Sequence, residues 1–320
     1  MSDAFAGGHL DEVLSQWGIT APYGVDPMGE HRDVRRITTD SGEYVVKDIT
    51  HSPGLPRLAF DCAIVEHLAA GRIPVVRPAK TRTGQYSVKQ GGRVFLLLPF
   101  VRCEPAGDRA SRAEILRYTG QVIADVHAVL ATYPMDNLLE HTWREDLAVD
   151  SVRWAESLLT RLPDHLGRIL REVWDSRREE AVNALRGLPE QLIHRDCHAG
   201  NFLVDGTRVV GLIDCDHFSV GPRMFDLAYY AGSSLKRITE DPAATTEWRH
   251  DLRSLVNGYR EHGELSAREC AAMPFGIMAD HLMLAHWFAE QGRVESTELD
   301  VKALLWLHRN LEAVKAAVMS

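Results

Sequence analysis

The sequence predicts an α+β protein of two lobes, in which a small antiparallel sheet is followed by a mostly helical region. Short β-rich runs separated by turn residues occupy the first hundred residues, and long helical patterns occupy most of the rest. The chain has 320 residues and 45% hydrophobic side chains, which is enough to bury a core in each lobe. We therefore expect lobes at residues 1–102 and 103–320, with the boundary in the segment from Pro99 to Gly107.

The amino-terminal lobe is expected to be a small antiparallel sheet with one inserted helix. Ser41-Gly42 and Gly91-Gly92 are turn signals that join neighbouring β-rich runs. The helix is expected over 57–70, where apolar residues recur on one face and Gly71 occupies the position of a carboxyl-terminal cap. The expected strands cover residues 23–28, 34–40, 43–49, 85–90 and 93–98.

The second lobe is expected to begin with a helix that Ser111 and Glu114 open as a capping box and that runs to about Ala131. A strand-like island, 191–217, interrupts the helical pattern. Further helices are expected at residues 151–162, 164–186, 245–262, 267–291 and 298–318.

Composition excludes several classes of protein. The chain carries 45 acidic and 36 basic residues, a formal charge of −9, which argues against a nucleic-acid binder and against a polybasic membrane surface. Its longest apolar run, 94–101, is far shorter than the ~20 residues that span a bilayer. No signal peptide is visible, and five irregularly spaced cysteines suit reduced thiols. We expect a cytoplasmic protein whose oligomeric state the sequence leaves open.

The island carries the candidate chemistry. His194, Asp196, Asn201 and Asp214 are flanked by apolar runs that are typical of short buried strands, so their side chains are expected to project from loops at strand ends. Carboxylate and amide oxygens are ligands that Mg²⁺ prefers. The island therefore predicts a magnesium-dependent site.

The pattern His194-x-Asp196-x-x-x-x-Asn201, followed by Ile213-Asp214, resembles the aminoglycoside phosphotransferase and choline kinase family of the protein-kinase-like superfamily. The resemblance implies a bilobal protein-kinase-like fold, ATP as the phosphoryl donor with GTP as an alternative, and Mg²⁺. It further implies that Asp196 is the base toward the acceptor hydroxyl, that Asn201 and Asp214 hold the metal, and that His194 braces the loop.

The same resemblance assigns a nucleotide-binding set to the first lobe. Lys47 would contact the α- and β-phosphates, and Glu66 on the helix would pair with it. The loop at Gly29 takes the place of a phosphate-covering loop, although it departs from G-x-G-x-x-G and could equally be an ordinary hairpin turn. The backbone around Phe100 and Val101 would form the hinge that binds adenine.

Other residues near the island have competing interpretations. His198 lies two residues after the proposed base and could contact the transferred phosphoryl group, whereas Asp216 could ligate the metal or support its loop. Asp226 matches a downstream aspartate that braces the catalytic loop in these families. The residues Cys197, His198, Cys215 and His217 could form a zinc site, but their spacing is poor for one.

The helical remainder is expected to build the acceptor pocket. Asp280, His281 and Trp287 lie at helical spacings and could bind a cationic or sugar-like acceptor, or they could belong to an amphipathic core helix. The predicted function is transfer of the γ-phosphoryl group to a hydroxyl of a small molecule: an antibiotic, an amino alcohol, homoserine or a sugar. The alternatives are a kinase acting on Ser or Thr of a biosynthetic peptide, a non-catalytic nucleotide-binding scaffold, and a zinc-dependent hydrolase.

Overall fold

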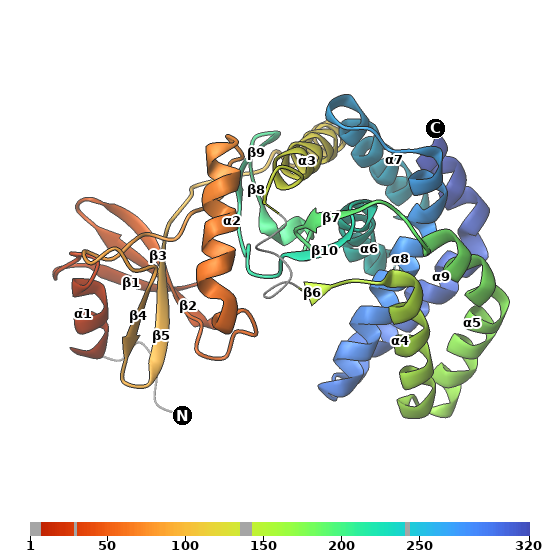
Figure 1. Ribbon diagram of the computed structural model, residues 1–320, viewed down its shortest axis with the longest axis horizontal. Coiled ribbons are helices and arrows are strands. Elements are labelled where there is room, and N and C mark those ends of the chain that lie inside the picture. Colours follow the sequence, from red (N-terminus) through yellow and green to blue (C-terminus); the bar gives the residue numbers. More distant parts are fainter. Residues whose placement is uncertain (1–7, 29–30, 135–142, 241–243) are drawn as a thin grey trace. The chain divides into compact units, whose positions relative to one another are not determined.

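The computed structural model describes residues 8–28, 31–134, 143–240 and 244–320. The chain forms two compact units: unit 1 comprises the residues up to Cys103 together with Val210–Asp216, and unit 2 comprises Glu104–Val209 and His217–Ser320. Figure 1 shows a small sheet in unit 1 and a largely helical unit 2, so the predicted α+β class is confirmed.

Unit 1 is built on a five-stranded antiparallel sheet with the order β1-β2-β3-β5-β4. Gly91 and Gly92 both have positive φ in the turn between β4 and β5, a conformation that favours glycine. The expected small antiparallel sheet is therefore confirmed. The strands are β1 Gly24–Met28, β2 His31–Thr39, β3 Gly42–Asp48, β4 Ser87–Gln90 and β5 Arg93–Pro99.

Two helices accompany this sheet. Helix α2, Leu58–Ala70, follows a short 3-10 turn, Leu55–Arg57, and matches the predicted helix. Helix α1, Gly8–Ser15, was not predicted; it buries Val13 and Leu14 in a cluster with Ile37, Val46 and Phe95 from the sheet. This cluster packs α1 against the strands of unit 1.

The segment 210–216 belongs to unit 1, whereas the predicted division placed it in the helical lobe. Backbone hydrogen bonds explain the difference: Leu212 N–H donates to Pro74 O at 2.7 Å, and Val76 N–H donates to Leu212 O at 2.9 Å. The metal-ligand candidates Asp214 and Asp216 therefore belong to the same compact unit as Lys47.

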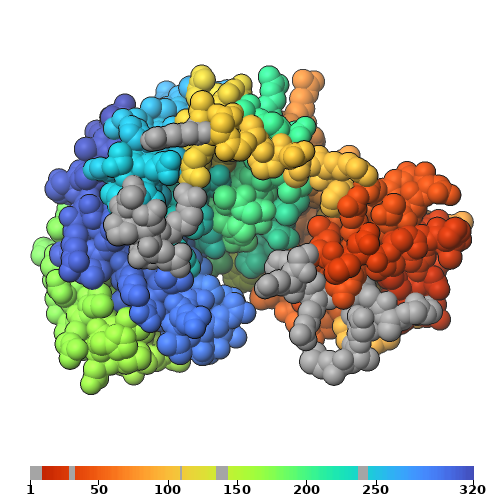
Figure 2. Space-filling view, turned by 180° about the vertical axis from the view of Figure 1, so that it is seen from behind, coloured from red at the N-terminus to blue at the C-terminus, as the bar shows by residue number. Residues whose placement is uncertain are grey.

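Unit 2 consists mainly of long helices. Helices α3 and α7 cross so closely that a Cβ on Gly258 would lie 1.9 Å from Arg117 O, and one on Gly120 would lie 2.1 Å from Leu255 O. In Figure 2, α4 and α5 in green adjoin α8 and α9 in blue over one face of unit 2. The helices are α3 Arg109–Leu130, α4 Leu147–Arg161, α5 Asp164–Leu185, α6 Met224–Glu240, α7 Ala244–His262, α8 Ala267–Glu290 and α9 Val294–Met319.

Two features of the helices correct the sequence prediction. The cap of α3 is Asp108, whose carboxylate accepts from Ser111 N–H at 3.0 Å, so Ser111 lies inside the helix rather than capping it. A complete capping box occurs instead at α8, between Ser266 and Glu269. Helix α6 was not predicted; its first half is buried on every side.

Short strands hold the island in place. In unit 2, β6 Trp143–Arg144, β10 Ser219–Pro222 and β7 Glu190–Ile193 form a three-stranded sheet in that order. Strand β8, Phe202–Asp205, follows the candidate catalytic loop, and the chain leaves unit 2 within β9, Arg208–Leu212. None of the helices among the described residues has the length and hydrophobicity that crossing a membrane requires.

Candidate active site

The loop from His194 to Asn201 is anchored by a buried carboxylate. Asp226, near the start of α6, has no exposed surface. Its Oδ2 accepts from His194 N–H at 2.9 Å, and its Oδ1 accepts from Arg195 N–H at 2.8 Å. These two bonds fix the backbone immediately before Asp196, as expected of a loop-bracing aspartate.

A second layer holds Asp226 itself. His127 Nε2 of α3 lies 2.9 Å from Asp226 Oδ2, and His127 Nδ1 lies 3.0 Å from the Tyr259 hydroxyl of α7. Burial acts to raise the pKa of Asp226, but the hydrogen bond and charge of His127 and the donors from the loop outweigh it, so the pKa lies below its usual value. Asp226 is therefore an ionised anchor joining α3, α6 and the loop.

The proposed base, Asp196, is held through both carboxylate oxygens. The Tyr229 hydroxyl donates to Oδ1 at 2.9 Å, and Asn201 Nδ2 donates to Oδ2 at 3.0 Å. Burial and the charge of Asp196 raise the pKa of Tyr229 well above its usual value, so the phenol stays protonated and donates. Arg195 has a φ of 70°, a left-handed conformation that orients the loop at this point.

His198 lies beside the proposed base. Its Nδ1 accepts from Gly200 N–H at 3.1 Å, and its Nε2 lies 3.7 Å from Asp196 Oδ2. Because Nδ1 accepts a hydrogen bond, the proton of the neutral ring is on Nε2 and faces Asp196. His194 instead packs its ring against Phe218, with 5.7 Å between centroids, which suits a bracing role.

The predicted zinc alternative finds no support in the described part of the chain. No group of three or more His, Cys, Asp or Glu side chains there could hold a metal ion. Cys197 is buried, which suits a small core residue.

Unit 1 brings together Lys47 and Asp214. Lys47 Nζ lies 2.7 Å from Asp214 Oδ1, with the side chains 27% and 42% exposed. Lys47 lies near the carboxyl end of β3, where it pairs with Leu96 of β5, and Asp214 has a left-handed φ of 53°. Asp216 faces Ser52, whose Oγ is 3.5 Å from its carboxylate.

The predicted pairing of Lys47 with Glu66 is wrong. Glu66 contacts Arg77 Nη1 and the Tyr86 hydroxyl, each at 3.4 Å. The cavity-facing stripe of α2 comprises Leu58, Asp61, Cys62 and Val65, which line a cavity of about 60 Å³ together with Lys47 and Asp214. Glu66 lies beyond the edge of this stripe and lines a different pocket.

Asp61 is thus the acidic residue of α2 on the same side as Lys47, and sequence reasoning missed it. It is 2% exposed and is held by Arg57, whose Nη2 donates to Asp61 Oδ1 at 2.7 Å. The spacing of the apolar residues on this helix contained the signal, because positions 58, 61, 62 and 65 recur at three- and four-residue intervals.

Two further predictions concern backbone segments. Gly29 lies outside the described residues. Phe100 N–H donates to Glu43 O at 2.9 Å, so this amide belongs to the edge of the sheet, and the hinge contact with adenine stays a prediction. Val101 lines a pocket with Tyr44.

The acceptor candidates on α8 lie at different depths. Asp280 and His281 are fully buried, whereas Trp287 is 47% exposed and packs against Phe288 with 5.0 Å between centroids. These three side chains therefore do not line one open pocket. Sequence reasoning also missed Tyr229, although it lies one helical turn after Asp226 and would have been found by continuing the helix from there.

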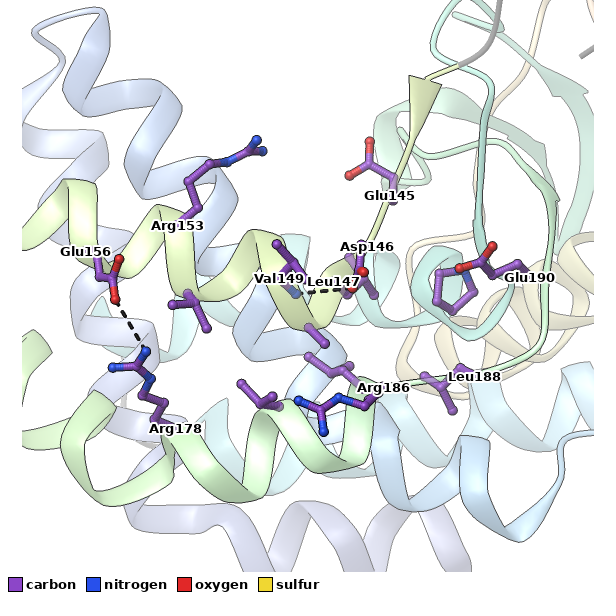
Figure 3. A pocket seen from close by; sticks show the side chains of 16 residues that line it. Glu145, Asp146, Leu147, Val149, Arg153, Glu156, Arg178, Arg186, Leu188 and Glu190 are labelled. Carbon is purple, nitrogen blue, oxygen red and sulfur yellow. Dashed lines mark hydrogen bonds and ion pairs between the residues drawn. The ribbon is translucent and has the colours of Figure 1, made fainter. Parts of the chain in front are cut away.

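A groove of about 590 Å³ lies between α4 and α5 of unit 2 (Figure 3). Leu147 and Leu188 contribute to its apolar lining, and Glu156 and Arg178 pair at one end. None of the predicted site residues lines it. One of its lining residues, Glu145, is hydrogen-bonded to Arg195 of the loop.

Comparisons with known proteins agree with this geometry. The model of the phosphotransferase enzyme family matches residues 26–266. The chain is 28% identical over 250 residues to the homoserine kinase of Neisseria meningitidis serogroup B, covering 74% of this chain and 73% of that one. It is 27% identical over 244 residues to the homoserine kinase of Methylobacterium nodulans, covering 74% and 70%.

Solved structures share the fold. A microcompartment-associated aminopropanol kinase superposes with a TM-score of 0.71 at 18% identity, covering 96% of this chain and 98% of that one. An aminoglycoside phosphotransferase from Alicyclobacillus acidocaldarius gives a TM-score of 0.66 at 16% identity, covering 95% and 96%. The amicoumacin kinase hAmiN, in complex with AMP-PNP and Ca²⁺, gives 0.64 at 15% identity, covering 91% and 88%. The expected protein-kinase-like fold is thereby confirmed.

Proposed function

Since the chain belongs to the phosphotransferase enzyme family, we propose that it transfers the γ-phosphoryl group of ATP to the hydroxyl group of a small molecule. The observation that carries the proposal is the double restraint on Asp196, whose two carboxylate oxygens are held by Tyr229 and Asn201 in a loop whose backbone is fixed by Asp226. Phosphoryl transfer depends mainly on positioning and charge neutralisation, and this loop provides positioning.

Asp196 acts as the base in the proposed reaction. The acceptor hydroxyl gives its proton to the Asp196 carboxylate as its oxygen bonds to the γ-phosphorus, and the bond from that phosphorus to the bridging oxygen breaks to release ADP. His198 presents its Nε2–H on the same side and supplies a donor toward the transferred group. His194 does not react and keeps the loop packed on Phe218.

Unit 1 supplies the residues for the nucleotide. Lys47 is the cation for the α- and β-phosphates, and its contact with Asp214 keeps the ammonium group oriented. The buried Asp61 beside this cavity, held by Arg57, replaces Glu66 as the acidic residue of α2 in this set.

The side chains also fit Mg²⁺. Asn201 turns its amide nitrogen to Asp196, so the carbonyl oxygen is the atom that can ligate a metal ion. Asp214 of unit 1, with a partly exposed carboxylate, would be the second candidate ligand, and Asp216 supports its segment. When bound, Mg²⁺ would neutralise charge on the β- and γ-phosphates.

An acceptor screen with ADP release as the readout tests the proposal. Hydroxyl compounds of different classes are offered with ATP and Mg²⁺, and thermal shift with ATP is measured with and without Mg²⁺. We expect metal-dependent stabilisation by ATP and ADP release with at least one small acceptor. No stabilisation in either condition would contradict the function. Phosphorylation of a peptide Ser or Thr alone would replace the small-molecule acceptor by a peptide.

The role of Asp196 is tested separately. Asp196→Asn keeps both hydrogen-bond partners within reach but cannot take a proton, so turnover should fall by at least roughly 100-fold while ATP still stabilises the protein. Asp175→Asn, an exposed carboxylate on α5, is the matched control and should retain the parent rate. Parent-level turnover by Asp196→Asn would exclude Asp196 as the base.

A further inference from the structure

One ion pair beside the loop that carries the proposed base takes no part in the chemistry described above. Glu145 lies between β6 and α4 (Figure 3), and its carboxylate accepts a hydrogen bond from Arg195 Nε. Arg195 immediately precedes Asp196 in the sequence. The Glu145 side chain is 6% exposed and that of Arg195 is 24% exposed, so the pair is largely shielded from water.

The three-stranded sheet of unit 2 holds Glu145 in place. Its backbone N–H donates to Val220 O of β10 at 2.8 Å, which continues the pairing of β6 with β10 by one residue. Gly221 of β10 leaves the space for the Glu145 side chain, since a Cβ on this glycine would lie 3.2 Å from Glu145 Cβ. The carboxylate therefore projects from a fixed point of the sheet and not from a free loop.

Arg195 has a backbone conformation that needs support. Its φ of 70° lies in the left-handed region, which costs conformational energy for a residue with a Cβ. Two restraints offset this cost: Asp226 accepts from the Arg195 N–H at 2.8 Å, and Glu145 holds the guanidinium group. The guanidinium group also lies over the Trp143 ring, with Cζ 5.6 Å from the centroid, and Nη2 donates to Met283 Sδ at 3.7 Å. Backbone and side chain of Arg195 are thus both fixed.

The conformation and the charge of Arg195 both bear on Asp196. The two residues share a planar peptide group, so the direction of the chain at Arg195 sets the place of the Asp196 carboxylate. Burial raises the pKa of Tyr229 and the charge of Arg195 acts in the opposite direction, which places this charge within electrostatic reach of the hydroxyl that donates to Asp196. Without Glu145, the guanidinium group would be drawn to the neighbouring carboxylate of Asp196.

We propose that Glu145 is a positioning residue for the reaction: by holding the guanidinium group of Arg195, it keeps the Asp196 carboxylate in place and free of an ion pair with that cation. This inference rests on the proposed function. A guanidinium group on Asp196 would compete with Tyr229 and Asn201 for the two carboxylate oxygens. It would thereby move the base away from the position that the acceptor hydroxyl requires.

Glu145→Gln tests the proposal, because it keeps the size of the side chain and one acceptor oxygen but removes the charge that holds Arg195. Steady-state ADP release is measured with ATP, Mg²⁺ and the hydroxyl compounds of the acceptor screen, homoserine included. We expect kcat to fall by roughly 10-fold or more while KM for ATP changes by less than about 2-fold. Parent-level kcat would overturn the positioning role.

Asp251→Asn is the matched control for the loss of a buried ion pair. Asp251 is 8% exposed and pairs with Arg112, so that it joins α7 to α3 instead of holding the loop. Both variants should lower Tm, but Asp251→Asn should keep the parent kcat. An equal loss of kcat in the two variants would mean that Glu145 contributes stability alone and would overturn the inference.

A double variant shows whether Glu145 acts through Arg195. In the Arg195→Met background, the addition of Glu145→Gln should change kcat by less than about 2-fold, because the residue through which Glu145 acts is gone. A further loss of roughly 10-fold in that background would overturn the mediation by Arg195.

Hydrogen exchange tests the same point without an acceptor. The His198 N–H donates to Asp196 O at 3.1 Å, and it should exchange at least roughly 10-fold faster in Glu145→Gln but at the parent rate in Asp251→Asn. Unchanged exchange in Glu145→Gln would overturn the inference whatever the acceptor is. Failure of the parent protein to release ADP with every compound of the screen would instead contradict the proposed function.

Discussion

Replacing Asp226 by asparagine should loosen the loop that carries Asp196. The carboxylate accepts from two backbone N–H groups and lies 2.9 Å from His127 Nε2. Asparagine offers one acceptor oxygen and turns an NH₂ group toward one of these donors. A hydrogen bond to a charged group contributes about 1.5–3 kcal/mol, and breaking a buried pair costs about 3–5 kcal/mol. We expect the free energy of unfolding of unit 2 to fall by about 3–5 kcal/mol.

Urea titration followed by tryptophan fluorescence measures this loss, since Trp154, Trp174 and Trp248 are buried in unit 2. Hydrogen exchange reports the His194 and Arg195 amides, which should lose protection. Tyr259→Phe is the matched control: it removes only the hydroxyl next to His127 Nδ1 and should cost about 1 kcal/mol. A loss below about 1 kcal/mol in Asp226→Asn with unchanged amide protection would refute the anchoring role.

The same variant makes a pH prediction. The folded-state pKa of Asp226 lies below its usual value, so the stability it contributes is present above the unfolded pKa of about 3.9. That contribution is lost as the pH falls through the folded pKa. Asp226→Asn should therefore unfold with a shallower dependence on pH in the acid range, and an acid profile identical to the parent's would contradict the ionised anchor.

Three further changes test other parts of the structure. Gly258→Ala would place a Cβ 1.9 Å from Arg117 O and should lower the free energy of unfolding by at least about 2 kcal/mol. Gly167→Ala, in open space on α5, should raise it by about 0.5–1 kcal/mol. Equal Tm values for the two variants would contradict the close crossing of α3 and α7. Burial raises the pKa of the Cys62 thiol to about 12, so iodoacetamide at pH 8 should label it only after unfolding; rapid native labelling would mean that α2 is not packed as described. Burial raises the pKa of Asp280 in the folded state, so the parent protein loses stability as the pH rises above the unfolded pKa of about 3.9. Asp280→Asn removes this loss and should be more stable than the parent by about 1–4 kcal/mol near pH 8. A variant less stable than the parent would show that the Asp280 carboxylate is satisfied.

Much of the fold could be predicted because local signals and tertiary structure agree in it. Turn glycines and β-rich runs located every strand of the first sheet, and one-sided apolar periodicity located α2 and most helices of unit 2. Helix α6 was not predicted, because its first half is buried on every side and hides the one-sided pattern that the whole helix has. The sequence did not predict that residues 210–216 belong to unit 1, because this depends on backbone hydrogen bonds to Pro74 and Val76, which side-chain patterns do not encode.

The candidate site could also be predicted only in part. Motif spacing predicted that Asp196 and Asn201 share one loop, and the structure places their side chains in contact. The sequence could not show that Asp61, and not Glu66, lines the same cavity as Lys47, because this depends on the rotation of α2 against the sheet. The full burial of Asp280 could not be predicted either, because helical spacing shows which residues share a face of the helix but not which elements cover that face.

The route of the chain limits how this enzyme could be recombined with its relatives. The chain passes between the units after Cys103, after Val209 and after Asp216, so unit 1 is not a continuous stretch of sequence. A single crossover at residue 103 would give a chimera whose Lys47 faces a foreign 210–216 segment, with foreign partners for Pro74 and Val76. Exchange of unit 1 between family members should therefore preserve function only when 210–216 is transplanted together with the first 103 residues.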